Sequence, residues 1–344
     1  MDVSDASDSR LANLTRWVIE DLGFEGATIA AASVDASFRR YFRVTRDSDS
    51  YIVMDAPPDK EDSAPFLTVA RILGGMNLNV PIVLARDMRR GFLLLSDLGS
   101  RQYLDALPED GAADRLYGDA LAALCTMQTA DARASLRLPR YDRALLMREM
   151  QLLPEWFLHR HLGFELGNAE HAMLDALFGS LVDAALSQPA VFVHRDYHSR
   201  NLLVTPQNNP GILDFQDAVW GPVTYDLASL LKDCYIAWPP TRVREWVLEY
   251  RERLLGAGFA LRADAAEFVR WFDLMGLQRH IKVLGIFARL FYRDGKAQYL
   301  KDLPRVLDYA RDTALHCPES RHFAEFIVKR IDPAFKDAQQ RALR

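Results

Sequence analysis

Residues Val191–Asp217 read VFVHRDYHSRNLLVTPQNNPGILDFQD, and we take this stretch as the starting point for interpreting the chain. It begins with an apolar triplet that predicts a short strand and continues as a polar loop that contains Asp196 and Asn201. A short apolar hairpin follows and leads to Ile212, Leu213, Asp214 and Phe215. The stretch therefore places two carboxylates and one amide in loops beside short strands.

These three polar side chains fit the chemistry of phosphoryl transfer from a nucleotide. That reaction uses one carboxylate to orient the attacking hydroxyl and accept its proton, and a carboxylate with an amide to hold Mg²⁺ on the phosphates. Asp196 would be the catalytic carboxylate, while Asn201 and Asp214 would be the metal ligands. Their spacing matches the pattern H-x-D-x-x-x-x-N followed by D-F, in which these roles are assigned.

The composition of the chain limits its size class and its partners. A chain of 344 residues with 49% hydrophobic residues can bury a large core, and its length is typical of two domains or lobes. The net charge of −5 lacks the basic footprint of nucleic-acid-binding proteins, so no nucleic-acid partner is expected.

Cysteine usage and hydropathy indicate a cytoplasmic protein. Cys125, Cys234 and Cys317 lie far apart, which predicts neither a disulfide framework nor a zinc site. The first ten residues, MDVSDASDSR, lack the basic start and apolar run of a signal peptide. No apolar stretch approaches the length of a transmembrane helix, so no membrane partner is expected.

Hydrophobic periodicity predicts sheet in the first part of the chain and helices after it. Apolar spacings of three and four predict helices over residues 9–22 and 65–76. Two hairpins are predicted, one joining 38–44 to 51–54 and the other joining 82–84 to 92–95. From about Tyr103 the chain is strongly helical. We therefore predict an α+β fold with a small antiparallel-sheet lobe over 1–98 and a larger, mostly helical lobe over 99–344.

Three motifs together resemble the aminoglycoside phosphotransferase and choline kinase group. They are HRDYHSRN over residues 194–201, the pair Asp214-Phe215, and Asp226-Leu227-Ala228. The resemblance implies a two-lobed, protein-kinase-like fold and an enzyme that uses ATP and Mg²⁺. It also implies that Asp226 supports the catalytic loop, although Asp226 precedes an apolar helix and could instead serve as its N-cap.

Further segments resemble a narrower group, the bacterial anomeric kinases of cell-wall recycling. These segments are SFRRYFRV, YIVMDAPP, LLLSDLG, HRDYHSRNLL, DFQDAVWGPVTYDLASLLKDCY and LQRHIKVLGIFARL. The resemblance implies phosphorylation of the anomeric hydroxyl of N-acetylmuramate and/or N-acetylglucosamine. Two alternatives stay open, namely a kinase of aminoglycosides or other small alcohols, and a nucleotide-binding module of the pseudokinase type.

The nucleotide side departs from the kinase pattern at one position. The third strand of that pattern carries a lysine for the α- and β-phosphates, whereas Ile52-Val53-Met54-Asp55 contains none. An arginine of the first hairpin, Arg43 or Arg40, is the predicted substitute, since a guanidinium offers a planar fork of donors. The full set of predicted nucleotide-binding residues is Ser37, Arg39, Arg40 and Arg43, with Ser96 and Leu98 at the hinge.

The acceptor side is predicted from local charge. Residues 270–301 contain seven basic and two acidic residues, which favours a neutral or anionic substrate over a polycationic one. Gln278, Lys282 and Arg289 share one face of the predicted helix, which could bind a sugar or face solvent. Further candidates for sugar contact are His198, Arg200, Asp233 and Tyr235. We thus expect a small-molecule sugar as the partner and a monomeric protein.

Overall fold

The computed structural model describes residues 3–34, 38–130 and 138–342, and its chain divides into two compact units. Unit 1 comprises residues 1–101 and 203–217, and unit 2 comprises residues 102–202 and 218–344. The sequence-based boundary at residue 98 lies close to the end of the first segment. The segment 203–217, which we had assigned to the second lobe, is part of unit 1.

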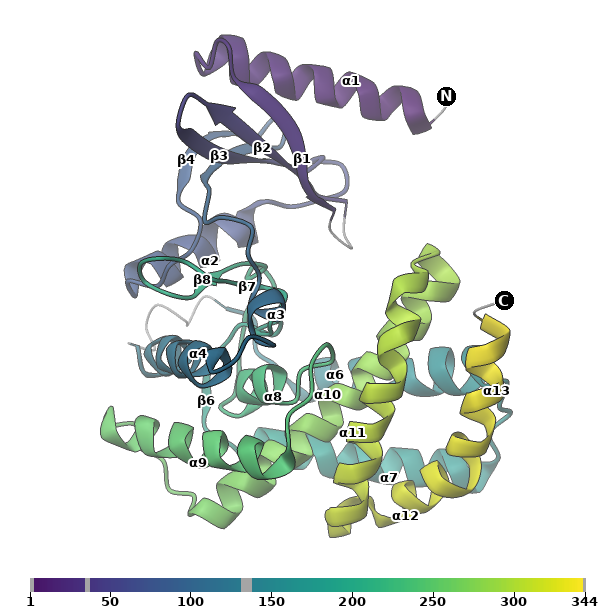
Figure 1. Ribbon diagram of the computed structural model, residues 1–344. Helices are drawn as coiled ribbons and strands as arrows, with labels where there is room; N and C mark the ends of the chain where they lie inside the picture. Colours follow the sequence, from purple (N-terminus) through teal and green to yellow (C-terminus); the bar gives the residue numbers. More distant parts are fainter. Residues whose placement is uncertain (1–2, 35–37, 131–137, 343–344) are drawn as a thin grey trace. The chain divides into compact units, whose positions relative to one another are not determined.

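Unit 1 is built on a five-stranded antiparallel sheet (Figure 1). Its strands are β1 (Thr28–Val34), β2 (Arg40–Arg46), β3 (Asp49–Asp55), β4 (Val83–Asp87) and β5 (Phe92–Ser96), in the order β1-β2-β3-β5-β4. The β2–β3 and β4–β5 hairpins confirm the two predicted hairpins. Gly91 closes the second one at a φ of 76°, and a Cβ there would lie 1.9 Å from the carbonyl oxygen of Ala56. Only glycine fits that turn.

Two helices accompany the sheet in unit 1. Helix α1 (Val3–Arg16) continues into the π-helical turn η1 (Trp17–Asp21), which together cover the predicted helix over 9–22. The core cluster combines Trp17 and Val18 of η1 with Val44, Val53 and Phe92 of the sheet, so this helical segment covers one sheet face. Helix α2 (Ala64–Gly75) confirms the predicted helix over 65–76.

Residues 203–217 join unit 1 through local packing. Strands β7 (Leu202–Leu203) and β8 (Gly211–Ile212) form a small hairpin, and the Ile212 amide donates to the carbonyl of Asn79 at 2.8 Å. The ring of Phe215 lies 4.9 Å from that of Phe66 on α2. This apolar contact holds the Asp214 segment beside α2.

Unit 2 is mostly helical, as predicted (Figure 1). A two-stranded sheet in this unit pairs β6 (Ala190–Val193) with β9 (Val219–Pro222) in antiparallel register. The helices before this sheet are α3 (Tyr103–Ala106), α4 (Ala112–Thr129), α6 (Arg143–Met150), the π-helical η2 (Leu153–His161) and α7 (Asn168–Leu186). Those after it are α8 (Tyr225–Leu231), α9 (Pro240–Gly256), α10 (Ala265–Asp294), η3 (Ala297–Asp302), α11 (Leu303–His316), η4 (Pro318–Ser320), α12 (Arg321–Phe326), η5 (Ile327–Ile331) and α13 (Asp332–Ala342).

Helix α10 is the central element of unit 2. It has 30 residues and packs against α6, η2, α7, α8, α9 and α11. Because it is surrounded, even its charged and polar residues Gln278, Arg279, His280 and Lys282 are buried. Helix α10 therefore contributes two buried cations, Arg279 and Lys282, that act on the β6–β7 loop.

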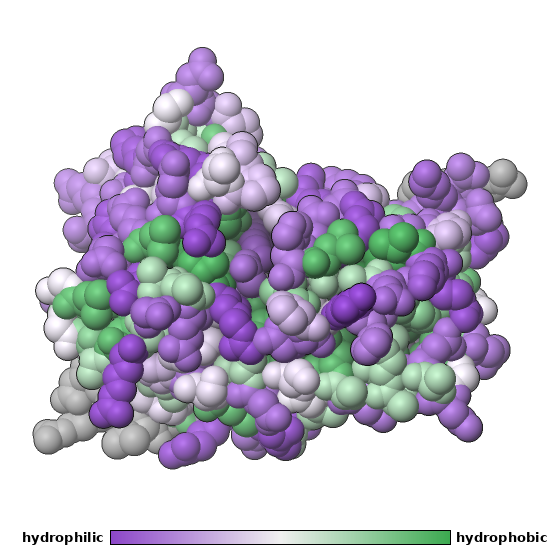
Figure 2. All heavy atoms as spheres, turned by 90° about the horizontal axis from the view of Figure 1, so that it is seen from below, coloured by the Kyte–Doolittle hydropathy of each residue, from purple (hydrophilic) through white to green (hydrophobic). Residues whose placement is uncertain are grey.

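Large apolar side chains are exposed at several separate places along the described chain, among them Phe38, Ile82 and Leu315. The face in Figure 2 combines hydrophilic areas with several apolar patches. Among the described helices, none combines the length and the apolar composition needed to cross a bilayer.

Candidate active site

The loop between β6 and β7 folds around the backbone of Asp196. The carbonyl of Asp196 accepts a hydrogen bond from the His198 amide at 3.1 Å and another from the Asn201 side-chain nitrogen at 3.0 Å. The Asn201 amide in turn donates to the carbonyl of His198 at 2.9 Å. With its nitrogen used as a donor, Asn201 has its side-chain oxygen as the atom that could bind a cation. The structure thus brings Asp196 and Asn201 together.

Two buried carboxylates outside the loop, and one buried tyrosine within it, hold the loop in place. Asp226 of α8, fully buried, accepts from the amides of His194 at 2.6 Å and Arg195 at 3.0 Å. Asp233 accepts from the Ser199 amide at 2.9 Å, and the Tyr197 hydroxyl donates to the carbonyl of Ala120 at 2.9 Å. Asp226 supports the catalytic loop, whereas Thr224 occupies the N-cap position of α8. The supporting role is therefore the correct one of the two predicted for Asp226.

Cations around Asp196 favour its ionised form. Burial alone would raise the pKa of this carboxyl, but the neighbouring cations Lys282, Arg279 and Arg195 lower it below the usual value. A carboxylate that stays ionised can accept a proton from a hydroxyl held within hydrogen-bond reach. The electrostatics of unit 2 therefore suit Asp196 as a general base.

Asp226 behaves in the opposite way, and this difference predicts a pH dependence of stability. Burial outweighs the two amide hydrogen bonds and raises the pKa of Asp226 to about 7. The folded protein then binds this proton more tightly than the unfolded chain, so the stabilising contribution is present below pH ~4 and is lost as the pH rises through about 7.

The Asp226→Asn variant has no carboxyl group to ionise at this position. Between pH 4.5 and pH 7, its free energy of unfolding should therefore fall less than that of the wild type. The fall in the wild-type unfolding free energy that is due to Asp226 is about 1.4 kcal/mol for each pH unit between the pKa of Asp226 in the folded protein and its pKa in the unfolded chain. Urea unfolding of both proteins across this range measures it. Parallel curves of unfolding free energy for the two proteins would contradict the prediction.

Asp214 belongs to unit 1 and has its own local geometry. Its φ of 62° lies in the left-handed region, which aspartate enters more readily than most residues. The side-chain nitrogen of Gln216 donates to Asp214 Oδ1 at 2.7 Å, and the neighbouring Phe215 is fully buried against Phe66. Asp214 is half-buried and Asp217 is exposed. The packed phenylalanine thus fixes the segment while the carboxylate of Asp214 keeps access to solvent.

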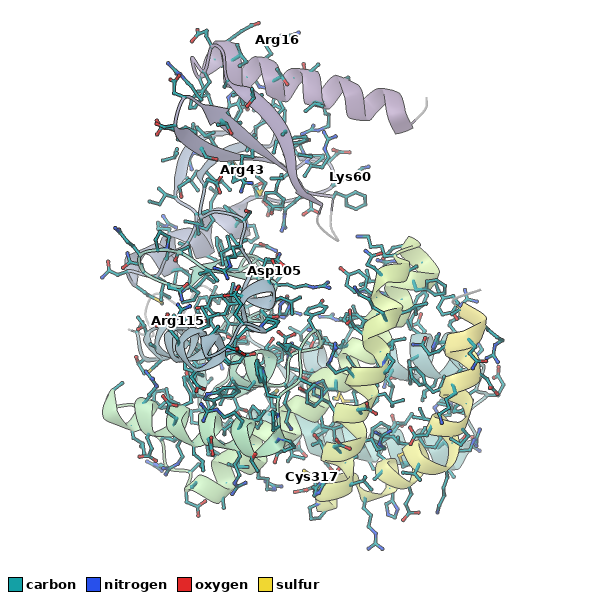
Figure 3. All side chains as sticks on the ribbon, in the orientation of Figure 1. Arg16, Arg43, Lys60, Asp105, Arg115 and Cys317 are labelled. Carbon is teal, nitrogen blue, oxygen red and sulfur yellow. The ribbon has the colours of Figure 1, made fainter. Side chains whose placement is uncertain are left out.

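The arginines predicted to bind nucleotide all form ion pairs within unit 1. Arg39 lies 3.1 Å from Glu61, and the Arg40 Nε donates at 3.0 Å to the fully buried Asp55, which Arg10 also contacts. Arg43, labelled in Figure 3 on the sheet, donates to Asp97 at 2.6 Å and to the carbonyl of Gly99 at 3.1 Å. Although burial opposes it, hydrogen bonds from Arg43, the Ser50 hydroxyl and the Gly99 amide lower the pKa of Asp97.

The remaining predicted nucleotide-binding residues are Ser37, Ser96 and Leu98, and their surroundings differ. Ser37 lies outside the described residues. The Ser96 hydroxyl accepts from the Ile82 amide at 2.8 Å, so it helps to close the sheet edge. The Leu98 side chain packs beside Gly211, where an added Cβ would lie 3.2 Å from Leu98 Cδ1.

Four sugar-binding candidates lie together at the catalytic loop in unit 2. The Arg200 guanidinium stacks 3.7 Å above the ring of Tyr235, and His198 meets the same ring edge-on at 5.4 Å between centroids. Asp233 accepts from the Tyr235 amide at 2.9 Å, in addition to the Ser199 amide. Burial is the main cause that lowers the pKa of His198, so the ring is neutral at pH 7.

The other three candidates, on α10, have different surroundings. Gln278 is fully buried, and Lys282 forms a buried ion pair with Glu149 at 2.9 Å. Arg289 is half-buried two helical turns further along α10, where burial and Arg293 lower its pKa. Lys282 nevertheless acts on the loop, since it lowers the pKa of Asp196. Among the described residues, no hydrogen bond or ring contact joins Gln278 or Arg289 to His198, Arg200, Asp233 or Tyr235.

Two functional candidates escaped the sequence reasoning. Glu149 contacts both Arg195 and Lys282, and Arg279 donates to the carbonyl of Arg195 at 3.1 Å. Both are charged residues on helix faces that are otherwise apolar, and this pattern in the sequence could have indicated them. Their partners lie far away in sequence, so the pattern alone could not predict what they bind.

Comparison with known sequences and structures places the chain in a family. The profile described as "Phosphotransferase enzyme family" matches residues 28–268. The chain belongs to this phosphotransferase family. It therefore transfers a phosphoryl group to a hydroxyl acceptor, and the family predicted from the motifs is confirmed.

Curated relatives cover nearly the whole of this phosphotransferase. A protein named N-acetylmuramate/N-acetylglucosamine kinase from Pseudomonas putida is 44% identical over 332 residues, which is 94% of this chain and 97% of the relative. Proteins of the same name from Pseudomonas aeruginosa and Neisseria meningitidis are 48% and 44% identical, covering 88% and 92% of both chains.

Solved structures confirm the protein-kinase-like fold. An ethanolamine kinase from Plasmodium vivax has a TM-score of 0.63 at 11% identity, covering 86% of this chain and 85% of its own. The GDP complex of an aminoglycoside 2'-phosphotransferase has a TM-score of 0.60 at 17% identity, covering 86% and 98%. At these identities the likeness concerns the fold alone.

Proposed function

We propose that this phosphotransferase is an ATP- and Mg²⁺-dependent kinase that phosphorylates the anomeric hydroxyl of N-acetylmuramate and/or N-acetylglucosamine. The observation that carries the proposal is the 44–48% identity, over 88–97% of their lengths, to three relatives named as kinases of these two sugars. The ionised Asp196 at the centre of an ordered loop supports it from the side of the chemistry.

Asp196 orients the sugar hydroxyl and accepts its proton as the new bond to phosphorus forms. The loop suits this role, because two hydrogen bonds fix the Asp196 carbonyl and neighbouring cations keep its carboxylate charged. The proton leaves the hydroxyl oxygen for the carboxylate, and the nucleotide departs as the diphosphate. Asp196 holds that proton until solvent takes it.

Asn201 and Asp214 are the proposed Mg²⁺ ligands, and their donor atoms fit that ion. Mg²⁺ prefers oxygen ligands and is usually held by one or two carboxylates together with phosphates and water. When bound, Mg²⁺ neutralises phosphate charge. Asn201 contributes its amide oxygen and Asp214 a carboxylate oxygen.

His198, Arg200, Asp233 and Tyr235 are the proposed contacts to the sugar. Their grouping at the catalytic loop supports this, since a stacked arginine and an aromatic ring offer both a charge and an apolar face. The Arg200 guanidinium suits a carboxylate such as that of N-acetylmuramate. The proposal includes a cytoplasmic monomer, consistent with three free, buried cysteines.

Arg43 is the proposed replacement for the missing strand lysine on the nucleotide side. The two guanidiniums are equally exposed, but Arg40 pairs with the fully buried Asp55, which Arg10 also contacts, whereas Arg43 pairs with Asp97. Arg43→Ala should raise the KM for ATP about tenfold, since a charge-assisted hydrogen bond contributes on the order of 1.5–3 kcal/mol. Steady-state kinetics with varied ATP measure this.

The matched control is Arg46→Ala, which removes a more exposed arginine from the end of the same strand and should leave the KM for ATP unchanged. Arg39→Ala and Arg40→Ala complete the series. If all of these variants kept the wild-type KM and kcat, the assignment of an arginine to the phosphates would be dropped.

The experiment that tests the proposed function is a substrate screen. ATP consumption is measured with N-acetylmuramate, N-acetylglucosamine, kanamycin and choline, and products are examined by phosphorus NMR. We expect an acid-labile phosphate coupled to the anomeric proton of an N-acetylated amino sugar. Phosphorylation confined to kanamycin or choline would overturn the substrate, and nucleotide binding without any turnover would favour a binding module.

A further inference from the structure

Arg195, which directly precedes Asp196, is held in an unfavourable backbone conformation. Its φ is 79°, in the left-handed region that residues with a Cβ rarely adopt. No glycine supplies the freedom that this conformation normally requires. The position of the Asp196 side chain follows from this backbone turn, so whatever stabilises Arg195 in it also orients Asp196.

Polar contacts anchor Arg195 at three points of its structure. Its amide donates to Asp226 Oδ1 at 3.0 Å, and its carbonyl accepts from Arg279 Nη1 at 3.1 Å. Its guanidinium forms an ion pair with the buried carboxylate of Glu149. The first two contacts fix the backbone on either side of the strained torsion angle. The third contact fixes the direction of the Arg195 side chain, and this direction is tied to the left-handed backbone conformation.

Glu149 is itself the centre of a buried cluster. Besides Arg195, it contacts the Lys282 ammonium at 2.9 Å and accepts a hydrogen bond from the Tyr141 hydroxyl. Lys282 also donates to the Tyr225 hydroxyl at 3.1 Å. The side chains of Glu149 and Lys282 are each less than a tenth exposed, so solvent screens their interaction little. One carboxylate therefore balances two cations, and removing it would leave Arg195 and Lys282 facing each other.

A close contact between two helical segments brings this cluster into register. A Cβ placed on Gly285 of α10 would lie 2.4 Å from the carbonyl carbon of Leu152 and 2.5 Å from its oxygen. The backbone of α10 therefore touches the chain just before η2, which only glycine permits. Glu149 lies three residues before Leu152 and Lys282 three residues before Gly285, so the same contact places the two charges together.

We infer that Glu149 is a positioning residue for phosphoryl transfer, acting through Arg195 to hold the left-handed backbone turn that aims Asp196. The inference rests on the proposed function, since it assigns Asp196 as the catalytic residue. Glu149 touches neither nucleotide nor sugar in this assignment. Its loss should therefore lower kcat and leave both KM values near those of the wild type.

Glycine at position 195 provides a specific test, because glycine adopts a φ of 79° without strain. Arg195→Ala and Arg195→Gly both remove the guanidinium, but only alanine retains the unfavourable backbone. We expect Arg195→Gly to be about tenfold more active than Arg195→Ala. Glu149→Gln should lower kcat about ten- to hundredfold in the wild type and less than about threefold when Arg195→Gly is already present.

A second double variant covers the case in which Glu149→Gln fails to fold. Glu149→Gln combined with Lys282→Met removes one charge of each sign, so the buried cations no longer repel each other. This double variant should be more stable than Glu149→Gln alone, while the amides of His194 and Arg195 should still exchange faster than in the wild type, because Arg195 still lacks its partner. Asp183→Asn, in the exposed pair with Arg143, is the matched control and should behave as the wild type.

Hydrogen–deuterium exchange separates this inference from the proposed function. The amides of His194 and Arg195 should exchange faster in Glu149→Gln, with no further change when Glu149→Gln is added to Arg195→Gly. If the wild type phosphorylates no sugar but this exchange pattern holds, the proposed function fails and the role of Glu149 in holding the loop stands. Equal losses of kcat from Glu149→Gln in both backgrounds, or unchanged exchange, would overturn the inference.

Discussion

Asp196→Asn is expected to lower the kcat for sugar phosphorylation about 10²- to 10⁴-fold, the range that a positioned general base contributes. Asparagine keeps the size of the side chain and one acceptor oxygen, but it cannot take a proton at pH 7. The loop should stay folded, because the hydrogen bonds from Asn201 and His198 go to the backbone carbonyl of Asp196 and do not involve its carboxylate.

Binding should be affected far less than turnover in this variant. The KM for ATP is expected to stay within about threefold of the wild type, since only interactions made in the transition state are lost. Asp105→Asn, at an exposed position of α3 in the same unit, is the control and should keep full activity. A loss of less than tenfold in kcat for Asp196→Asn would remove Asp196 from the role of base.

The sequence predicted that Asp196 and Asn201 lie together, because their spacing is local. Asp196 and Asn201 are five residues apart, and a loop that short keeps them near each other, as the hydrogen bond between them shows. The two hairpins and α2 were likewise predictable, since alternating and helical apolar spacings are local signals. Strand β1 was missed, because its sequence TIAAASV lacks a clear apolar and polar alternation.

Roles that depend on distant packing could not be predicted in the same way. Periodicity placed Lys282 and Gln278 on one face of a helix, but it could not say what that face packs against. The answer lies in Glu149, which is 133 positions away from Lys282 and meets it only because Gly285 lets α10 approach Leu152. The membership of segment 203–217 in unit 1 could not be predicted for a similar reason. The contact of Phe215 with Phe66 joins two residues that are far apart in sequence.

Asp214→Asn is expected to impair the use of the Mg²⁺–nucleotide, with kcat/KM for ATP falling about 10²- to 10³-fold, comparable to the loss of one fixed electrostatic contact to developing charge. An amide oxygen is a weaker ligand for Mg²⁺ than a carboxylate, which supplies a full negative charge. The segment itself should stay folded, since Phe215 remains buried and asparagine tolerates the φ of 62°.

The distinguishing measurement is thermal stabilisation by ATP with and without Mg²⁺. A ligand that binds only the folded form raises stability by RT ln(1 + [L]/Kd), so a weaker Kd appears directly as a smaller shift. Asp196→Asn should keep the Mg²⁺-dependent shift and Asp214→Asn should lose it, while Asp47→Asn, exposed in the β2–β3 turn at a φ of 54°, should keep it as a control. Equal thermal shifts and equally mild kinetic losses in the Asp196 and Asp214 variants would contradict both assignments. The reason is that a base and a metal ligand act on different steps. The base removes the proton from the sugar, whereas the metal ligand holds the phosphates before that step begins.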